Sequence, residues 1–401
     1  MNKVIYLDNN ATTKVDERIF EEMKPYFCEK YGNPSSIHAF GGEVSHAVKK
    51  ARNQVKEMLG AENEREIIFT AGGSESANMA IKGVLDLNKD KKHIITSKVE
   101  HPCVLNLYKW LEKRGYRVTY LGVNSEGELD LNELRESVTE DTALVSVMYA
   151  NNETGVIFPI EQMGEIIKSK NKNTKFFVDA VQAAGKIPIN VSDMQVDMLG
   201  ISGHKLHAPK GVGALYIKKG IMLTPLVIGG HQEFGKRAGT ENVTSIVGLG
   251  VAADLAVDAL KEENTTVRAL RDKLEKGLLE RIYNARVNGG KANRVPNTSN
   301  ISFEYIEGEL ILLHLSDIGI CASSGSACTS GSLEPSHVLK AMGIPFTSMH
   351  GSVRWSLSRF TTEEEINYVL EHVPDIIINK INKLSPYQQQ LEDLKRQKNM
   401  K

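Results

Sequence analysis

Several features that mark whole classes of protein are scarce or missing in this sequence. Its 401 residues include four cysteines, which form no Cys-x-x-Cys pair and have no histidine spacing suited to zinc. The 49 Lys and Arg residues nearly balance the 50 Asp and Glu residues, so the net charge of −1 gives no field that would attract nucleic acid or an anionic membrane. The longest apolar runs, such as residues 376–378, are far too short to span a bilayer.

The N-terminal segment and the cysteines point to a cellular location. Residues 1–8 read as a short strand and not as a signal peptide. Unpaired thiols suit a reducing compartment. We therefore expect a cytoplasmic protein that binds neither nucleic acid nor membrane.

The first half of the chain alternates strand-like and helical patterns. The strand-like runs are β-branched and apolar on both faces, which is typical of strands covered by helices on both sides. Alternation of this kind predicts βαβ units, an α/β fold and a mainly parallel seven-stranded sheet. The expected strands are 66–70, 93–97, 117–121, 143–149, 175–179, 196–202 and 212–217, and the expected helices are 74–87, with Ser74 as N-cap, 102–113, 131–138 and 160–169.

After Gly239 the pattern changes, and a chain of this length exceeds the size at which one core usually stops growing. Residues 242–282 predict one or two long helices, followed by strands near 298–303 and 353–358 and helices at 308–316 and 362–381. We therefore predict a large domain at 15–260, a smaller α+β domain made of 1–14 and 261–385, and a polar tail at 386–401.

Polar residues follow the predicted strands at their carboxyl ends, where parallel sheets bind ligands. A glycine turn ending in Gly73 and Ser74 opens a helix whose free N–H groups could hold a phosphate. A plain turn between strand and helix explains it equally well, and it matches neither a GxGxxG nor a P-loop pattern. His101 could be an acid–base group, a ring stacked on a ligand, or a polar residue that begins a helix.

Two further strand ends carry charged side chains. Burying Asp179 at the end of an apolar strand is costly unless a cation or hydrogen bonds compensate, and a protonated pyridine nitrogen would be such a cation. Lys205 suits a phosphate contact or a Schiff base, although most lysines are simply exposed. A phosphate cradle, an imidazole, amides, a carboxylate and a lysine at one sheet edge together predict a site for pyridoxal 5'-phosphate.

Cys328 occupies an unusual segment. In residues 322–332 no side chain is larger than the thiol except that of Thr329, so nothing there can pack a core. Structural cysteines are normally held among large apolar residues. Cys328 is therefore a candidate nucleophile on a loop that we expect to be mobile. Cys28, Cys103 and Cys321 lie in helical or strand-like patterns and give no such signal.

At this point the sequence resembles the cysteine desulfurases of the NifS/IscS class, which are fold-type I pyridoxal-phosphate enzymes of the class-V aminotransferase superfamily. The run Ser-Ser-Gly-Ser-Ala-Cys-Thr-Ser-Gly-Ser-Leu-Glu-Pro at 323–335 is very specific to this class, whereas Ser-Gly-His-Lys at 202–205 marks only the wider superfamily. His231, Gly331 and His337 favour the NifS branch. Other matching stretches are 6–13, 32–36, 100–101, 151–155, 178–182, 237–240 and 353–356.

The resemblance implies a role for each site residue. Catalysis would use Cys328 as nucleophile, Lys205 as the Schiff-base lysine and His101 as a stacked ring that moves protons. The other implied cofactor contacts are Asp179 at the pyridine nitrogen, Gln182 and Asn152 at the phenolate side, and Gly73, Ser74, Ser202 and His204 at the phosphate, with Thr240 supplied by a neighbouring subunit. Arg354 would bind the substrate carboxylate, and Asn33 and Asn152 would add substrate contacts.

The resemblance also implies the reaction and its partners. L-cysteine would give L-alanine and a persulfide on Cys328, and a homodimer would pass this sulfur to an iron–sulfur scaffold protein. The implied pathways are nitrogenase maturation, general cluster assembly or tRNA thiolation. No permanent metal is expected, although the Cys328 persulfide could briefly ligate a nascent cluster.

Two alternatives stay open at this stage. Another pyridoxal-phosphate lyase or transferase, such as a selenocysteine lyase, would share the cofactor site, but an aminotransferase would need no thiol on such a loop. A non-catalytic sulfur carrier or assembly scaffold would not need Lys205, Asp179 and His101 together.

Overall fold

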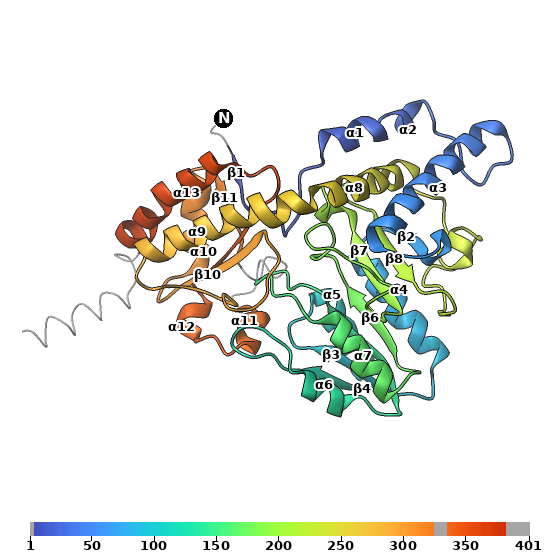
Figure 1. Cartoon of the computed structure of the whole chain (residues 1–401), viewed down its shortest axis with the longest axis horizontal. Helices are drawn as coiled ribbons and strands as arrows, with labels where there is room; N and C mark the ends of the chain where they lie inside the picture. The colour runs from blue at the N-terminus through green and yellow to red at the C-terminus, as the bar shows by residue number, and fades with distance from the viewer. Residues whose placement is uncertain (1–3, 325–334, 382–401) are drawn as a thin grey trace, which may run out of the picture.

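The structure is a computed structural model that describes residues 4–324 and 335–381. Its larger part is built on a seven-stranded sheet in the order β2-β8-β7-β6-β5-β3-β4 (Figure 1). The strands are β2 Ile67–Thr70, β3 His93–Ser97, β4 Arg117–Leu121, β5 Thr142–Met148, β6 Lys175–Asp179, β7 Met198–Ser202 and β8 Gly213–Ile217. Only β8 runs antiparallel to its neighbours. The predicted mainly parallel α/β sheet is confirmed, with strand bounds within two residues of those expected.

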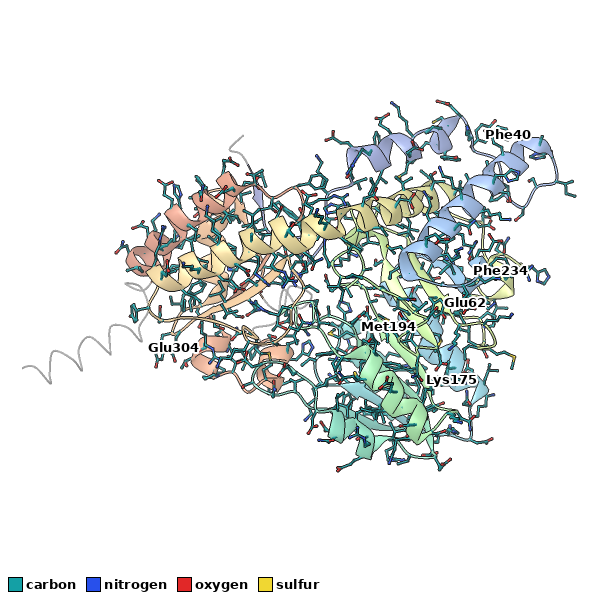
Figure 2. The ribbon with its side chains drawn as sticks, in the orientation of Figure 1. Phe40, Glu62, Lys175, Met194, Phe234 and Glu304 are labelled. Carbon is teal, nitrogen blue, oxygen red and sulfur yellow. The ribbon has the colours of Figure 1, made fainter. Side chains whose placement is uncertain are left out.

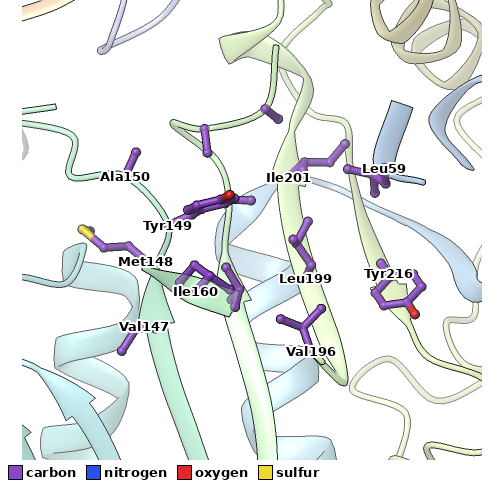
Figure 3. Packing of buried hydrophobic residues seen from close by; sticks show 14 of the residues in the cluster. Leu59, Val147, Met148, Tyr149, Ala150, Ile160, Val196, Leu199, Ile201 and Tyr216 are labelled. Atoms are coloured by element: carbon purple, nitrogen blue, oxygen red, sulfur yellow. The ribbon is translucent and has the colours of Figure 1, made fainter. Parts of the chain in front are cut away.

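Side chains that alternate along each strand pack into two hydrophobic clusters, one on each face of the sheet. On β6, Phe176 and Val178 belong to one cluster and Phe177 to the other. Figure 3 shows part of the first cluster, where Leu199 and Ile201 lie near Leu59. The first cluster includes residues of α3 Ala39–Leu59, α7 Ile160–Lys170 and α8 Val243–Glu262, and the second includes residues of α4 Gly73–Leu87 and α5 Pro102–Glu112.

The start of α4 differs from the expectation. Gly72, not Ser74, is the N-cap, and Ser74 is the second residue of the helix. Gly72 has φ 148°, a conformation that favours glycine. A Cβ on Gly73 would lie 2.7 Å from Cγ2 of Val181. The glycine pair thus allows the helix to begin one residue early and close to the segment that follows β6.

A smaller sheet forms the second hydrophobic unit. Its central strand β10 Thr298–Phe303 pairs antiparallel with β12 Ser352–Ser356 and β9 Ala285–Val287. Near the N-terminus, β1 Ile5–Tyr6 pairs parallel with β11 Ile320–Cys321, so the blue start of the chain lies among orange and red elements (Figure 1). Ile5 and Leu7 share a core with residues between 267 and 381, to which α9 Arg268–Arg281, α10 Gly308–Asp317 and α13 Glu363–Asp375 contribute. The domain boundaries given above stay a prediction.

Helix α8 and helix α9 are joined by the π-helical segment Glu263–Val267, as expected for one or two helices at 242–282. Together they form the continuous helix Val243–Arg281, which among the described residues is long enough, and with a mean hydropathy of 1.7 apolar enough, to cross a membrane. Half of its most apolar segment is, however, buried inside the protein. Helix α8 packs against α3 and α1 Glu17–Met23, which is the arrangement of a core helix.

Several short or glycine-containing elements were not expected from the sequence. They are α1, α2 Pro25–Cys28, α3, β9, α11 His337–Ala341 and α12 Phe346–Met349, whereas the expected helix 131–138 is present as α6 Leu131–Ser137. The expected strand at 353–358 ends at Ser356, and the expected helix at 362–381 is α13 continued by the π-helical segment Ile376–Ile381.

A buried ion pair joins α3 to the loop before α8. The guanidinium of Arg52 donates to both carboxylate oxygens of Glu233 at 2.6 and 2.8 Å, and the N–H of Phe69 donates to the same carboxylate at 2.9 Å. The guanidinium also lies over the rings of Phe69 and Phe234, 4.6 and 5.0 Å from their centroids; Phe234 itself reaches the surface (Figure 2).

We predict that Arg52→Met lowers the free energy of unfolding by about 3 kcal/mol, because it leaves the Glu233 carboxylate buried without its cation. Lys273→Met is the matched control. Its pair with Glu363 is also short, at 2.6 Å, but both side chains are exposed, so we expect a loss below about 1 kcal/mol. Urea unfolding followed by circular dichroism measures both, and equal effects in the two variants would contradict the prediction.

Candidate active site

A cavity of about 300 Å³ opens at the carboxyl ends of β5, β6 and β7. Its walls also include the first turns of α4 and α5, the segment after β1 and strand β12. Ten of the residues expected at the site line this one cavity: Gly73, Ser74, His101, Asn152, Asp179, Gln182, Ser202, His204, Lys205 and Arg354. The sheet edge therefore brings together residues that are up to 281 positions apart, from 73 to 354.

Lys205 ends the short 3-10 helix Gly203–Lys205 that follows β7. Its ammonium donates hydrogen bonds to the carbonyl oxygens of Asn10 and Ala11, the latter at 2.7 Å. The amide of Gln182 donates to the same Asn10 carbonyl at 3.0 Å. The N-terminal segment is thus a wall of the cavity that orients the lysine, a function that its sequence alone did not reveal.

Asp179 is the last residue of β6 and is 7 % exposed. Its Oδ1 accepts a hydrogen bond from the N–H of Val181 at 3.0 Å. Burial raises the pKa of the carboxyl to about 6, and the charge of Lys205 opposes this rise. A cationic nitrogen placed against this carboxylate would offset the cost of burying it.

Two imidazoles of the cavity are neutral at physiological pH. Burial, followed by the charge of Lys205, lowers the pKa of His101 and of His204 to about 4. His101 is the N-cap of α5, and its Nδ1 accepts the N–H of Cys103 at 3.2 Å. His204 Nδ1 lies 3.2 Å from the hydroxyl of Thr12. Neutral rings can stack on an aromatic ligand or exchange one proton without adding charge to the cavity.

The first turn of α4 forms an anion cradle together with the end of β7. The first N–H groups of a helix have no partner within the helix, and the helix dipole favours negative charge there. Gly73 and Ser74 supply such groups at the cavity wall, and the buried Ser202 faces them, 3.6 Å from the position of a Cβ on Gly72. This donor set fits a phosphate.

Arg354 enters the cavity from β12 of the smaller sheet. One of its terminal nitrogens donates to the carbonyl of Asn152 at 3.1 Å and the other to Asp8 at 2.8 Å. Its Nε–H is buried and donates no hydrogen bond to any residue that the structure describes. A guanidinium held in this way provides a fixed planar fork for a carboxylate.

Two expected site residues, Asn33 and Thr240, do not line the cavity of the single chain. Asn33 is exposed and its side chain accepts the N–H of Ser35. Thr240 is exposed on the loop before α8. Cys328 lies outside the described residues. Among residues 4–324 and 335–381, no group of three or more His, Cys, Asp or Glu side chains could hold a metal.

The structure adds cavity residues that sequence reasoning did not select. Cys103, interpreted above as structural, lines the cavity, and burial strongly raises the pKa of its thiol, so it stays protonated. Glu153 and His337 also line it. The signal available for Glu153 was its place four residues after the predicted strand 143–149 and next to Asn152.

Glu100, directly before His101, is a fully buried carboxyl group. Its Oε1 accepts the hydroxyl of Ser97 at 2.6 Å and the N–H of Met148 at 3.0 Å, whereas Oε2 has no partner among the described residues. Burial raises its pKa from 4.5 to about 8. The group therefore carries a proton in the folded protein at neutral pH.

We predict that Glu100→Gln stabilises the protein at alkaline pH. Between about pH 4.5 and 8 the folded carboxyl is protonated and the unfolded one is ionised, so unfolding releases a proton and stability falls as pH rises. Glutamine imitates the protonated form and removes this loss, about 1.4 kcal/mol for each pH unit crossed. Urea unfolding at pH 5.5 and 8.5 measures the difference from wild type, which should grow with pH. The exposed control Glu22→Gln should follow wild type at both values, and a constant difference for Glu100→Gln would refute the assignment.

Comparison with known proteins agrees with this geometry. Residues 5–369 match the family model described as aminotransferase class-V. The chain is 59 % identical over 384 residues to "Cysteine desulfurase 2" of Trichormus variabilis (strain ATCC 29413 / PCC 7937), covering 96 % of this chain and 95 % of the relative. It is 55 % identical over 383 residues to "Cysteine desulfurase NifS" of Azotobacter vinelandii, with 96 % and 94 % covered.

A solved structure has the same fold. A protein described as "NIFS-LIKE PROTEIN" superposes with a TM-score of 0.88 at 42 % sequence identity, covering 94 % of this chain and 99 % of the other. The matches span nearly the full length of both partners in each case. The chain therefore belongs to the class-V aminotransferase family and, within it, to the cysteine desulfurases of the NifS/IscS class.

Proposed function

We propose that the cavity binds pyridoxal 5'-phosphate and removes sulfur from L-cysteine, leaving L-alanine and a persulfide on Cys328. The observation that carries the proposal is the convergence of Asp179, Lys205, His101 and Arg354 on one cavity of about 300 Å³. A non-catalytic sulfur carrier or scaffold would have no use for a buried carboxyl, an oriented lysine and a guanidinium fork in the same space. The names of the relatives support the choice of cysteine as substrate.

The residues fit the cofactor in charge and shape. Asp179, whose carboxyl has its pKa raised by burial, would face the ring nitrogen and keep it protonated. Gly73, Ser74, Ser202 and His204 would hold the phosphate at the start of α4. Gln182 and Asn152 would contact the phenolate side, and the neutral ring of His101 would stack on the cofactor. When bound, pyridoxal phosphate supplies a carbonyl carbon for covalent attachment and a ring that accepts electrons.

The chain's own residues perform the binding and the proton transfers. The Nζ of Lys205, oriented by the Asn10 and Ala11 carbonyls, would hold the cofactor when no substrate is bound and would otherwise take and return a proton at the substrate. His101 exchanges a second proton as a neutral imidazole. Arg354 binds the substrate carboxylate, and Asn33 and Asn152 add contacts. The thiolate of Cys328 would attack the substrate sulfur: an S–S bond forms, the Cβ–S bond of the substrate breaks, and its electron pair stays on Cβ, which takes up a proton to become the methyl group of alanine.

The oligomer and the partners form the finer part of the proposal. We infer a homodimer in which Thr240, exposed here, completes the phosphate site of the neighbouring subunit. Phe40 is exposed at the start of α3 (Figure 2), and Tyr31 and Ile37, which precede this helix in the sequence, are exposed as well; these apolar side chains provide contact surface for a second copy. The sulfur would pass to an iron–sulfur scaffold protein in the cytoplasm.

One assay tests the main proposal. The purified protein, reconstituted with pyridoxal phosphate, should absorb in the visible range, lose this band with borohydride, and release alanine and sulfide from cysteine. Turnover of selenocysteine alone would instead favour a selenocysteine lyase. Absence of the visible band after reconstitution would eliminate the cofactor assignment.

We predict that Arg354→Lys raises the KM for cysteine about tenfold or more with a smaller change in kcat, because an ammonium cannot form a bidentate pair with the substrate carboxylate. Arg359→Lys is the matched control. The side chain of Arg359 is 7 % exposed, against 3 % for Arg354, and pairs with Asp16 at 2.8 Å, but it does not line the cavity. Steady-state alanine production measures both variants, and an equal rise in KM in the two would contradict the role of Arg354.

We predict that Cys328→Ser keeps the cofactor absorbance and the spectral response to cysteine but loses sulfide release by at least about 100-fold, because a hydroxyl is a much weaker nucleophile toward sulfur. Cys28→Ser, at an exposed thiol, should release sulfide at the wild-type rate. Normal turnover in Cys328→Ser would remove this residue from the mechanism.

A further inference from the structure

A third histidine lines the cavity, from the short helix α11. His337 is the first residue of α11, follows the N-cap Ser336, and lines the same cavity as His101. It is half-buried. Nothing in the function proposed above uses it, although its charge affects the pKa of His101, so the two rings lie close enough to interact.

The hydrogen bond of His337 fixes which of its nitrogens carries the proton. Nε2 lies 2.9 Å from the backbone carbonyl of Glu100, which can only accept, so Nε2 is the donor. In the neutral ring Nδ1 then has the lone pair. His101 has the opposite arrangement, because its Nδ1 accepts the N–H of Cys103 and Nε2 carries the proton. One cavity thus contains one imidazole with an acceptor nitrogen at Nδ1 and another with a donor nitrogen at Nε2.

The position of His337 is fixed by a second contact. The hydroxyl of Ser336 donates to Oε2 of the buried Glu153 at 2.5 Å and accepts the N–H of Leu339 at 3.1 Å. Glu153 also lines the cavity, next to Asn152 in the segment that follows β5. The start of α11 is therefore held at two points, and the imidazole has the arrangement of a base that is oriented by a third group.

We propose that Nδ1 of His337 accepts a thiol proton in this cavity, and this inference rests on the proposed desulfurase function. In this step the S–H bond breaks, an Nδ1–H bond forms and the electron pair stays on sulfur, so no oxidant or reductant is needed. The product is an imidazolium that donates to the Glu100 carbonyl and faces a thiolate. Two thiols can supply the proton, that of the substrate cysteine and that of Cys328.

The surrounding charges favour a neutral ring before this step. Burial and the charge of Lys109 on α5 lower the pKa of His337, whereas the hydrogen bond to the Glu100 carbonyl opposes them. Of the other titratable groups near it, His101 is neutral, Glu100 is protonated at neutral pH, and burial raises the pKa of Glu153 to about 7. A neutral imidazole is ready to accept a proton, and a thiolate beside it would stabilise the charged ring.

The test uses His337→Gln in the reconstituted, full-length protein. The glutamine amide can still donate to the Glu100 carbonyl but offers no titrating nitrogen. His314→Gln is the control, because His314 on α10 is also partly buried and does not line the cavity. Two quantities are measured between pH 5.5 and 9: kcat/KM for cysteine, and the rate at which iodoacetamide alkylates Cys328 without substrate, resolved by peptide mass spectrometry with the exposed Cys28 as internal reference.

We expect kcat/KM of His337→Gln to fall about 100-fold, with the cofactor absorbance retained and His314→Gln unchanged. If Cys328 supplies the proton, the midpoint of its alkylation profile also rises by about one pH unit. If the substrate supplies the proton, the midpoint of Cys328 alkylation is the same as in wild type and only kcat/KM falls. A variant that matches wild type in both quantities overturns the proposal, and His337→Asn repeats the test should the glutamine variant be unstable to urea.

This design separates the inference from the function on which it rests. If wild type releases no alanine from cysteine, the proposed function fails. In that case the alkylation profile of Cys328 still tests His337 separately. A midpoint shifted from wild type in His337→Gln supports the action of His337 on a thiol, and an unshifted midpoint ends the proposal.

Discussion

The carboxyl group of Asp179 sets the main constraint on this molecule. It ends an apolar strand in the middle of the sheet, where a carboxylate is costly to bury and its pKa is raised to about 6. The cost can be met by charge and hydrogen bonds in the cavity: the N–H of Val181, the ammonium of Lys205, and the ring nitrogen of the proposed cofactor. The position of the lysine in turn requires the carbonyls of Asn10 and Ala11. A single buried charge therefore links β6, β7 and the N-terminal segment.

The same constraint explains why segments far along the chain contact the N-terminal segment. Asn10 accepts hydrogen bonds from both Gln182 and Lys205, and its amide donates to Thr298 of β10 at 2.8 Å. Asp8 fixes Arg354 of β12. The segment after β1 thus connects the large sheet to the smaller one at the cavity. Residues from the first eleven positions orient both Lys205 and Arg354.

Much of the fold could be predicted because the strands are short, β-branched and apolar on both faces, as β5 and β6 show. Site residues such as Asp179 and Lys205 could be predicted for the same reason, because they lie at or just after the carboxyl ends of neighbouring strands. Helix α3 was not expected, because Gly41 and Gly42 in its first turn weaken the helical signal. Arg354 is a different case, since it came from the family resemblance. It lies inside a strand of the smaller sheet, and no local pattern indicates that this sheet faces the cavity.

The contacts that make Glu100, Glu153 and His337 part of the site could not be derived from the sequence, for a physical reason. Their importance lies in burial and in contacts between distant segments, such as the bond from Ser336 to Glu153 across 183 positions. Burial raises the pKa of both carboxyl groups and lowers that of the three cavity imidazoles, so all of them tend to be uncharged in the folded protein. The cavity then retains few fixed charges, chiefly Lys205 and Arg354, beside Asp179. A low charge density of this kind makes each remaining charge act strongly on a substrate, because nearby groups do not screen it.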